Sequence, residues 1–391
     1  MQAIRVIGSK RSTIAALAIA AAVLAGCSKS PSESAATNGD PAASHSTSVA
    51  RALPDDATMR AMVDEVLDFT EKRYMKAEEH AAWQIVHGIM AFGRQLKISS
   101  GGKLVPALDY LLEGGTLKGW TLKHGDHGLD AVLEAGTKTG QGHEDQWMGY
   151  IAQCDIPWVQ PITFQGKTYK FGDMITQAQW DIYDGMEASW TLIGLSSYLP
   201  MDAKWKAKDG SEWTLERIIA MESAQDLAES ACGGSHRMVG ITYALNRYLA
   251  EGGQLRGGWK AADDKVQSTI AACKQFQQPD GSLSTNYFER AATSPDVALR
   301  INTTGHQLEF LVMALTEAQL REPWVTRSVV HLCELLKQTR DLPIECGSLY
   351  HAAHGLVLYR LRLWPPTNPT NESAPAGESN TTASAAEAVT R

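Results

Sequence analysis

Histidine, glutamate and cysteine residues recur near the starts of six apolar segments in this 391-residue chain. The apolar residues follow the three- and four-residue steps of helices, and the segments start near residues 80, 143, 185, 235, 304 and 346. Imidazole, carboxylate and thiol groups transfer protons or bind metal ions, so their meeting would create a reactive site. If the helices lie side by side with their starts at one end, these side chains share one rim. That rim contains His87, His143, Glu144, Asp145, Glu187, Cys232, His236, Arg237, His306, Glu309, His351 and His354.

One interpretation of the rim is a glycoside hydrolase. Such enzymes use two carboxyl groups, and Glu144 or Glu187 facing Glu309 would supply them. The separation of the two groups would decide whether the product keeps or inverts its configuration. This hypothesis requires both carboxylates to reach one bound sugar.

A second interpretation is a uronic-acid lyase. His236 or His306 would serve as the base and Tyr350 as the acid. Arg237 would neutralise the carboxylate of the substrate. A structural alternative accounts for the same residue types, because polar side chains at helix starts also cap helices and hydrogen-bond neighbouring loops.

A metal site is the third interpretation. Cys232 and Cys346 occupy equivalent positions in two of the segments, and with His306 or His351 they would offer zinc two thiolates and an imidazole. Three protein ligands leave one position open for water or substrate, as in catalytic zinc sites. The same two cysteines could instead form a disulfide, since an oxidising compartment allows one.

The segments that precede these starts show amphipathic spacing, for example Leu215, Ile218 and Ile219. Each pairs with the apolar segment that follows it, and we predict helical hairpins near 57–96, 105–154, 173–198, 214–250, 260–319 and 323–362. Apolar second helices need neighbours on every side, which favours an all-α (α/α)6 toroid over 55–364 rather than an open solenoid. Residues 162–171 alternate around a glycine and predict one small β-hairpin insertion.

Two motifs resemble a known superfamily. Cys232-Gly-Gly-Ser-His-Arg-Met-Val begins one apolar segment, and Gln277-Gln-Pro-Asp-Gly-Ser-Leu283 follows it. They are similar to sequences in the terpenoid cyclase and protein prenyltransferase toroids, and in the thioester domain of α2-macroglobulin-like proteins. The resemblance implies the toroid fold but not the chemistry. Cys232 is followed by Gly-Gly-Ser and not by the Gly-Glu-Gln that a thioester needs, and the zinc motifs of the prenyltransferases are absent.

The chain begins with basic residues and an apolar run, which predict an export signal over 1–26. Leu24-Ala-Gly-Cys27 resembles a bacterial lipobox, which implies acylation of Cys27 and anchoring to the cell envelope by lipid. Ser28 after the cysteine implies sorting to the outer membrane. Residues 27–54 and 365–391 are poor in large apolar residues, so we expect a flexible linker and a disordered tail.

The charge of the chain limits its partners. Lys and Arg total 36 against 44 Asp and Glu, and no basic run interleaved with aromatic residues is present. A surface of this sign repels phosphate backbones, so we expect no nucleic-acid partner. We expect membrane association through the lipid and a polar small molecule or polysaccharide in the rim. A non-catalytic binding or scaffold protein is the alternative.

Overall fold

The computed structural model describes residues 52–365, and within this range it has 13 α-helices and four two-stranded sheets, with about 54 % of the residues helical. The signal sequence predicted over 1–26, the acylated Cys27, nearly all of the linker and the tail lie outside the described residues. No helix between residues 52 and 365 has the length and apolar character needed to cross a bilayer.

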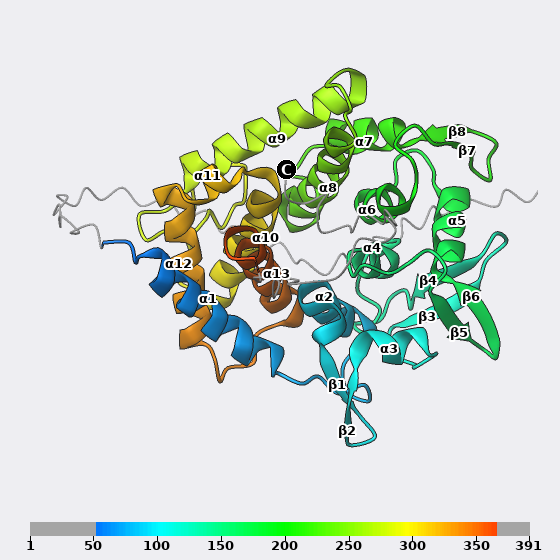
Figure 1. Cartoon of the computed structure of the whole chain (residues 1–391), viewed down its shortest axis with the longest axis horizontal. Coiled ribbons are helices and arrows are strands. Elements are labelled where there is room, and N and C mark those ends of the chain that lie inside the picture. The colour runs from blue at the N-terminus through cyan, green and yellow to red at the C-terminus, as the bar shows by residue number, and fades with distance from the viewer. Residues whose placement is uncertain (1–51, 366–391) are drawn as a thin grey trace, which may run out of the picture.

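Six largely apolar helices lie around the centre of the molecule (Figure 1). Each contacts the next one along the chain, and the last, α13, also contacts the first, α2. Their starts agree with the predicted apolar segments to within a few residues, except that α10 begins earlier. The helices are α2 (Ala82–Phe92), α4 (Gln146–Ala152), α6 (Ser189–Tyr198), α8 (Ser235–Ala250), α10 (Val297–Ala314) and α13 (Cys346–Leu363).

Amphipathic helices precede these central helices in the chain and pack outside them (Figure 1). Helix α12 is typical: Val325, Val329, Leu332 and Leu336 recur at helical steps, and all four are buried. The outer helices are α1 (Asp56–Glu71), α3 (Ala107–Leu112), α5 (Phe171–Asp181), α7 (Leu215–Ala224), α9 (Gly257–Phe276) and α12 (Pro323–Gln338), and the short α11 (Glu317–Leu320) links α10 to α12.

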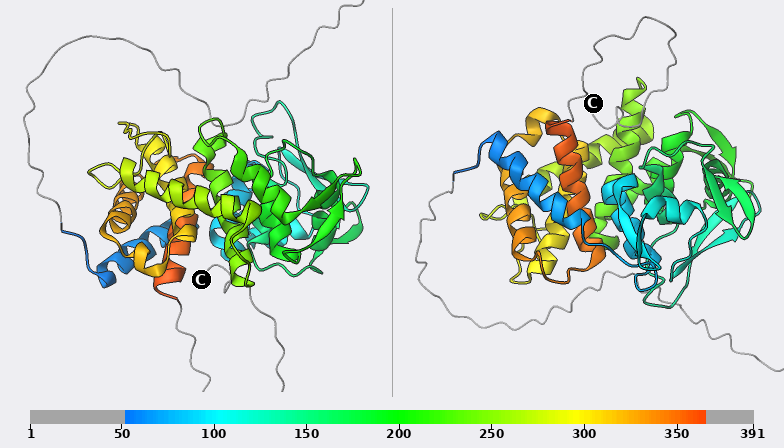
Figure 2. Two further views of the ribbon diagram at one scale, coloured as in Figure 1. Left: turned by 90° about the horizontal axis from the view of Figure 1, so that it is seen from above. Right: turned by 60° about the horizontal axis from the view of Figure 1, so that its bottom comes forward.

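The fold contains more β-structure than the sequence predicted. The expected hairpin is present as β5 (Pro161–Phe164) and β6 (Lys167–Lys170), but three further hairpins correct the all-α assignment. In one of them Gly101 and Gly102 both have positive φ, as a tight two-residue turn requires. The hairpin of β5 and β6 lies at the end of the molecule opposite α1 and α12 (Figure 2), whereas the hairpin with the Gly101-Gly102 turn lies next to α3 (Figure 1). The additional strands are β1 (Lys97–Ser100), β2 (Lys103–Pro106), β3 (Trp120–His124), β4 (Leu129–Leu133), β7 (Lys204–Lys206) and β8 (Glu212–Thr214).

The motif that begins at Gln277 directly follows α9 and is hydrogen-bonded to α12. The Gln277 side-chain amide donates to the backbone carbonyls of Gly281 and Trp324 and to the Ser328 hydroxyl. Gly281 has a φ of 93°, and Leu283 is fully buried. The motif therefore has a structural role here, holding the end of an outer helix against its neighbour.

Glycines allow the central helices to approach closely. A Cβ on Gly305 of α10 would lie 2.8 Å from the Ala352 Cα of α13, and one on Gly240 of α8 would lie 2.7 Å from the Ser189 carbonyl oxygen of α6. Real Cβ atoms do not approach backbone atoms this closely. The glycine side of each helix therefore faces its neighbour's backbone, and the centre is densely packed.

We expect Gly305→Ala to lower the free energy of unfolding by about 1–3 kcal/mol or more, because the added methyl group forces α10 and α13 apart. The measurement is urea denaturation followed by circular dichroism. Gly347→Ala is the matched control. It is also a helical glycine of this packed pair, yet its nearest neighbours are Glu345 side-chain oxygens at 3.2 Å, which can move. Equal destabilisation by both variants would contradict the packing argument.

Candidate functional site

Five imidazole rings from different parts of the chain meet between the central helices. The His306 and His351 ring centroids are 3.9 Å apart, those of His236 and His306 are 5.4 Å apart, and those of His87 and His351 are 5.1 Å apart. The His143 ring, which precedes α4, lies 5.0 Å from that of His236. The histidines of the predicted rim therefore do lie together, and all of these except His143 are buried.

Glu309 is the buried carboxylate of the cluster. His351 and His354 donate to its two oxygens through their Nδ1 atoms, at 2.7 Å and 2.5 Å. Burial opposes ionisation of Glu309, but its interactions with His351 and His354, hydrogen bonds among them, outweigh it and hold the pKa of the carboxyl well below its usual value. Burial lowers the pKa of His351 to about 3, so a neutral imidazole donates to an ionised carboxylate at neutral pH.

Hydrogen bonds to carbonyl oxygens determine which nitrogen of two other rings carries a proton. His306 donates from Nδ1 to the Asn302 carbonyl at 2.8 Å, and His87 donates from Nδ1 to the Trp83 carbonyl at 2.5 Å. A carbonyl oxygen only accepts, so the Nε2 atoms of both neutral rings carry a lone pair. Histidines that bind metal ions are oriented in this way.

The Tyr150 hydroxyl lies between the Nε2 atoms of two of the neutral rings, His87 and His351. It is 3.1 Å from His87 Nε2 and 3.3 Å from His351 Nε2, and it accepts a hydrogen bond from the Gln146 amide at 2.9 Å. A phenol has one proton, so it can donate to only one of the two rings. One of these two Nε2 lone pairs is therefore left without a proton from Tyr150 and is available to a cation.

His236 is the most informative residue of the cluster. It is the second residue of helix α8, only 4 % of it is exposed, and neither ring nitrogen has a hydrogen-bond partner. Burial, followed by the neighbouring histidines, lowers its pKa well below the usual value, so the ring is neutral. A buried polar atom left unpaired costs about 1–3 kcal/mol. A bound ligand would remove that cost.

Cys232 lies one turn before His236 in a strained segment. Cys232, Gly233 and Gly234 all have positive φ, of 48°, 60° and 78°. Glycine adopts this conformation readily, but a cysteine does so at a cost of about 1–3 kcal/mol. Any side chain at Gly233 would also strike the Tyr287 ring. The Cys-Gly-Gly sequence thus turns the chain sharply into α8 and sets the thiol beside His236.

Two sets of side chains have the spacing of metal ligands. The ligand atoms of Cys232, His236 and His306 lie within 4.8 Å of one another, and so do those of His143, Glu187 and His236. Zinc bonds of about 2.0–2.3 Å would bring tetrahedral ligands to about 3.3–3.8 Å from each other. Small side-chain rotations would therefore close either set around an ion.

The second set contains a hydrogen-bonded histidine and carboxylate at the solvent-facing side of the cluster. His143 Nδ1 lies 2.9 Å from Glu187 Oε2, and the two side chains are 17 % and 26 % exposed. Burial opposes ionisation of Glu187, but His143 and Arg237 outweigh it, and the pKa of the carboxyl is below its usual value. Its other oxygen, Oε1, is buried without a hydrogen-bond partner.

Cys346 does not belong to either set of metal ligands, although the sequence predicted that it would bind zinc together with Cys232. The structure has no disulfide between Cys346 and Cys232. The Cys346 thiol instead accepts a hydrogen bond from the Gln84 amide at 3.5 Å. Cys232 precedes α8, whereas Cys346 is the first residue of α13, so the expected equivalence of the two positions is wrong. His236 takes the place of Cys346 in the ligand set with Cys232 and His306.

Two further predicted residues lie away from the buried cluster. Glu144 is exposed and accepts a hydrogen bond from the Tyr183 hydroxyl at 3.1 Å. Tyr350 is buried, but its ring packs against Phe92 and next to Gly88, on another side of α13. Glu144 therefore lies outside the cluster that contains Glu309, which leaves Glu187 as the other carboxylate of the hydrolase hypothesis. Tyr350 is not placed to act as the acid beside His306.

Arg237 forms a salt bridge with Glu222, a residue that was not predicted from the sequence. Its guanidinium donates to Glu222 at 2.7 Å, and Glu222 also accepts from the Ala188 amide and the Ser189 hydroxyl at the start of α6. Arg237 therefore neutralises a buried carboxylate of the protein rather than one of a substrate. The signal for Glu222 was its position in the apolar spacing that starts at Leu215, which predicts a buried side chain.

Asp145 also belongs to the predicted rim. It accepts a hydrogen bond from the Thr191 hydroxyl at 2.5 Å, and burial raises its pKa to about 7. It is held in a left-handed conformation, with a φ of 58°, immediately before α4. It belongs to neither ligand set within the described part of the chain.

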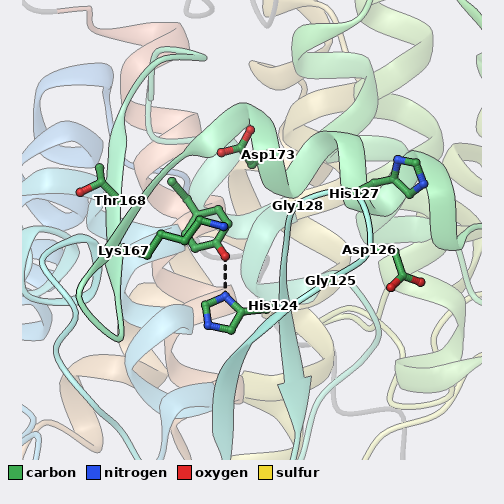
Figure 3. Close-up of a pocket in the computed structure, with 9 residues that line it drawn as sticks. His124, Gly125, Asp126, His127, Gly128, Lys167, Thr168 and Asp173 are labelled. Carbon is green, nitrogen blue, oxygen red and sulfur yellow. Dashed lines mark hydrogen bonds between the residues drawn. The ribbon is translucent and has the colours of Figure 1, made fainter.

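A separate cleft of about 510 Å³ lies beside the β-hairpins (Figure 3). His124 Nδ1 is hydrogen-bonded to the Tyr169 hydroxyl there, and the Lys167 ammonium lies 4.4 Å from the Tyr169 ring centroid. His127 stacks on Trp180 at the edge of this cleft. None of its lining residues belongs to either ligand set in the described part of the chain, so the histidine cluster remains the stronger candidate.

The chain matches no family model, no curated protein and no solved structure. Its function must therefore be inferred from the chemistry of these side chains.

We expect Glu309→Gln to lower the free energy of unfolding by about 2–3 kcal/mol at neutral pH, because an NH2 group replaces one of the two oxygens and cannot accept from the imidazole that faces it. Glu309 contributes fully to the free energy of unfolding above the pKa of a glutamate in the unfolded chain, about 4.3. That contribution is lost as the pH falls through the lower pKa of Glu309 in the folded protein. Urea denaturation at several pH values should therefore show the two proteins converging in acid.

The exposed Glu144→Gln is the matched control and should change stability by less than about 0.5 kcal/mol. A constant difference between wild type and Glu309→Gln from pH 7 to pH 3 would contradict the assignment of an ionised carboxylate.

Proposed function

We propose that this chain is a lipid-anchored envelope metalloprotein whose central helices hold a zinc-class ion through Cys232, His236 and His306. The observation that carries the proposal is the buried His236 ring, both of whose nitrogens lack a hydrogen-bond partner inside a set of metal-ligand spacing. Neutral imidazole is the form that binds metal ions, and thiolate with imidazole is a donor set that suits zinc.

We further propose that the six central helices form the inner ring of a closed (α/α)6 toroid. The support is the cycle of contacts from α2 through α4, α6, α8 and α10 to α13 and back to α2. An open solenoid would lack the contact between its first and last central helices. In this arrangement the ion lies where several helices meet, and the surrounding helices exclude bulk water from one side of it.

Three protein ligands would leave one position of a tetrahedral ion open. When bound, the ion would supply Lewis-acid chemistry, lowering the pKa of a coordinated water or polarising a carbonyl group. The Asn302 carbonyl orients His306 by accepting from Nδ1, so Nε2 remains to bind. His143 and Glu187 lie on the solvent-facing side, where an imidazole held by a carboxylate can accept a proton from a bound molecule.

We propose that the substrate is a polar molecule that is cleaved by hydrolysis or elimination. Carbohydrates are the first class of substrate to test. Half-exposed imidazole and carboxylate groups next to the ion would hydrogen-bond hydroxyl groups. The two catalytic pairs considered from the sequence lose support, because Glu309 is occupied by two histidines and Arg237 by Glu222. A binding protein that uses the metal only structurally is the alternative.

The lipid anchor is tested by Cys27→Ser. We expect the wild-type protein to incorporate labelled palmitate and sediment with membranes, and the variant to do neither, because each buried methylene of an acyl chain contributes about 0.8 kcal/mol of membrane binding. Membrane association of the variant at the wild-type level would show that Cys27 is not the anchor.

The metal proposal is tested with full-length protein that a chelator has stripped and that is then titrated with Co²⁺ and Zn²⁺. We expect a thiolate-to-cobalt absorption band in the near ultraviolet. Cys232→Ser should abolish that band. His236→Ala should weaken binding by at least about 100-fold, since losing a residue that only orients a ligand already costs about 10–100-fold.

Cys346→Ser is the matched control and should keep both the band and the affinity. A polysaccharide panel, scored by new reducing ends and by the absorbance of unsaturated products, then separates an enzyme from a binding protein. Absence of the cobalt band from the wild type, or its loss in Cys346→Ser, would refute the proposed site.

A further inference from the structure

We propose a second cation position, formed by His143, Glu187 and His236, so that the His236 ring is shared between two ions. This inference rests on the proposed ion at Cys232, His236 and His306 and extends it to a two-ion centre. The ligand atoms of the second set lie within 4.8 Å of one another, as those of the first set do, and His236 is the residue common to both.

The unpaired atoms of the cluster are the first argument. Both nitrogens of the His236 ring are buried without a partner, and so is the Glu187 Oε1 atom. One ion at Cys232 and His306 would use only one ring nitrogen of His236. An ion on the side of His143 would use the other nitrogen and would also lie within reach of the unpaired Glu187 oxygen, so two ions satisfy every one of these atoms.

The orientation of the His143 ring is the second argument. His143 Nδ1 is hydrogen-bonded to Glu187 Oε2 at 2.9 Å. That hydrogen bond orients the His143 ring as carboxylates orient histidines that bind metal ions. Arg237, the residue after His236, is bound to Glu222, so it does not occupy the place of the ion.

The donor types indicate which cations would bind. The second set has two imidazoles and a carboxylate but no sulfur, which suits Zn²⁺, Co²⁺ or Mn²⁺, whereas the thiol of the first set favours zinc-class ions. The His143 and Glu187 side chains are 17 % and 26 % exposed, while Cys232 is 7 % exposed. The second ion would therefore face solvent and contact substrate, and the first would be the more enclosed of the two.

Binding at both positions requires proton release from His236. A neutral imidazole carries one N–H proton, and two metal–nitrogen bonds need both nitrogen lone pairs. The ring therefore binds as imidazolate, the N–H bond breaks, and the proton passes to solvent. Metal binding that displaces ligand protons depends on pH in this way.

Metal stoichiometry of the full-length protein tests the proposal. After stripping, incubation with Co²⁺ and removal of free ion, we expect two ions per wild-type chain. Glu187→Gln should retain one ion with the thiolate-to-cobalt band, and Cys232→Ser should retain one ion without it. His143→Gln is a second route to the Glu187→Gln result if that variant does not fold, and Glu144→Gln is the matched control that keeps both ions.

The outcomes separate the two proposals. One ion per wild-type chain, carrying the cobalt–thiolate band and retained in Glu187→Gln and His143→Gln, overturns the second position and leaves the first intact. No bound ion in the wild type overturns both. Two ions that are both lost in Cys232→Ser would also overturn an independent second position, because that site contains no sulfur. Magnetic coupling between two Co²⁺ ions in electron paramagnetic resonance would support the shared ring.

Discussion

The ionised carboxylate of Glu309 constrains the helices around it. A charge in a protein interior needs hydrogen-bond donors, and His351 and His354 supply them from a single helix, α13. Helices α10 and α13 must therefore face each other in one register, and Gly305 lets their backbones approach closely enough. The same register stacks His306 against His351 at 3.9 Å and so sets one side of the candidate metal site.

Three unfavourable features meet at this centre, although other buried atoms without a partner, such as the Thr70 hydroxyl and the Trp205 indole nitrogen, lie elsewhere in the described chain. His236 is buried without a partner, Cys232 has a positive φ, and Glu187 has an unpaired oxygen. Each costs free energy in the absence of a ligand, and such costs persist where the surrounding structure holds the residues in place. Their concentration within one ligand-sized region is the pattern expected of a functional site and not of helix capping alone.

Several residues that suggested acid and base catalysis have structural partners. Arg237 neutralises Glu222 at the start of α6, and Glu309 orients two histidines. Residue type could not reveal this, because the same carboxylate can react with a substrate or can hold a neighbouring imidazole. Glu222 did leave a signal in the sequence, since a charged residue at an apolar helical position predicts burial with a partner. The glycine pair Gly101-Gly102, which forms the turn between β1 and β2, was a second signal.

The sequence by itself determined the helices and where their polar starts lie. Periodicity of apolar residues is a local property, so α8, α10 and α13 could be predicted from it, and with them the expectation that their histidines meet. Which side chains meet depends on the angle and register of each helix against its neighbours, and these follow from packing between residues far apart in the chain. The tertiary structure therefore decided that Cys232 joins His236 and His306, while Cys346, the first residue of α13, is hydrogen-bonded to Gln84.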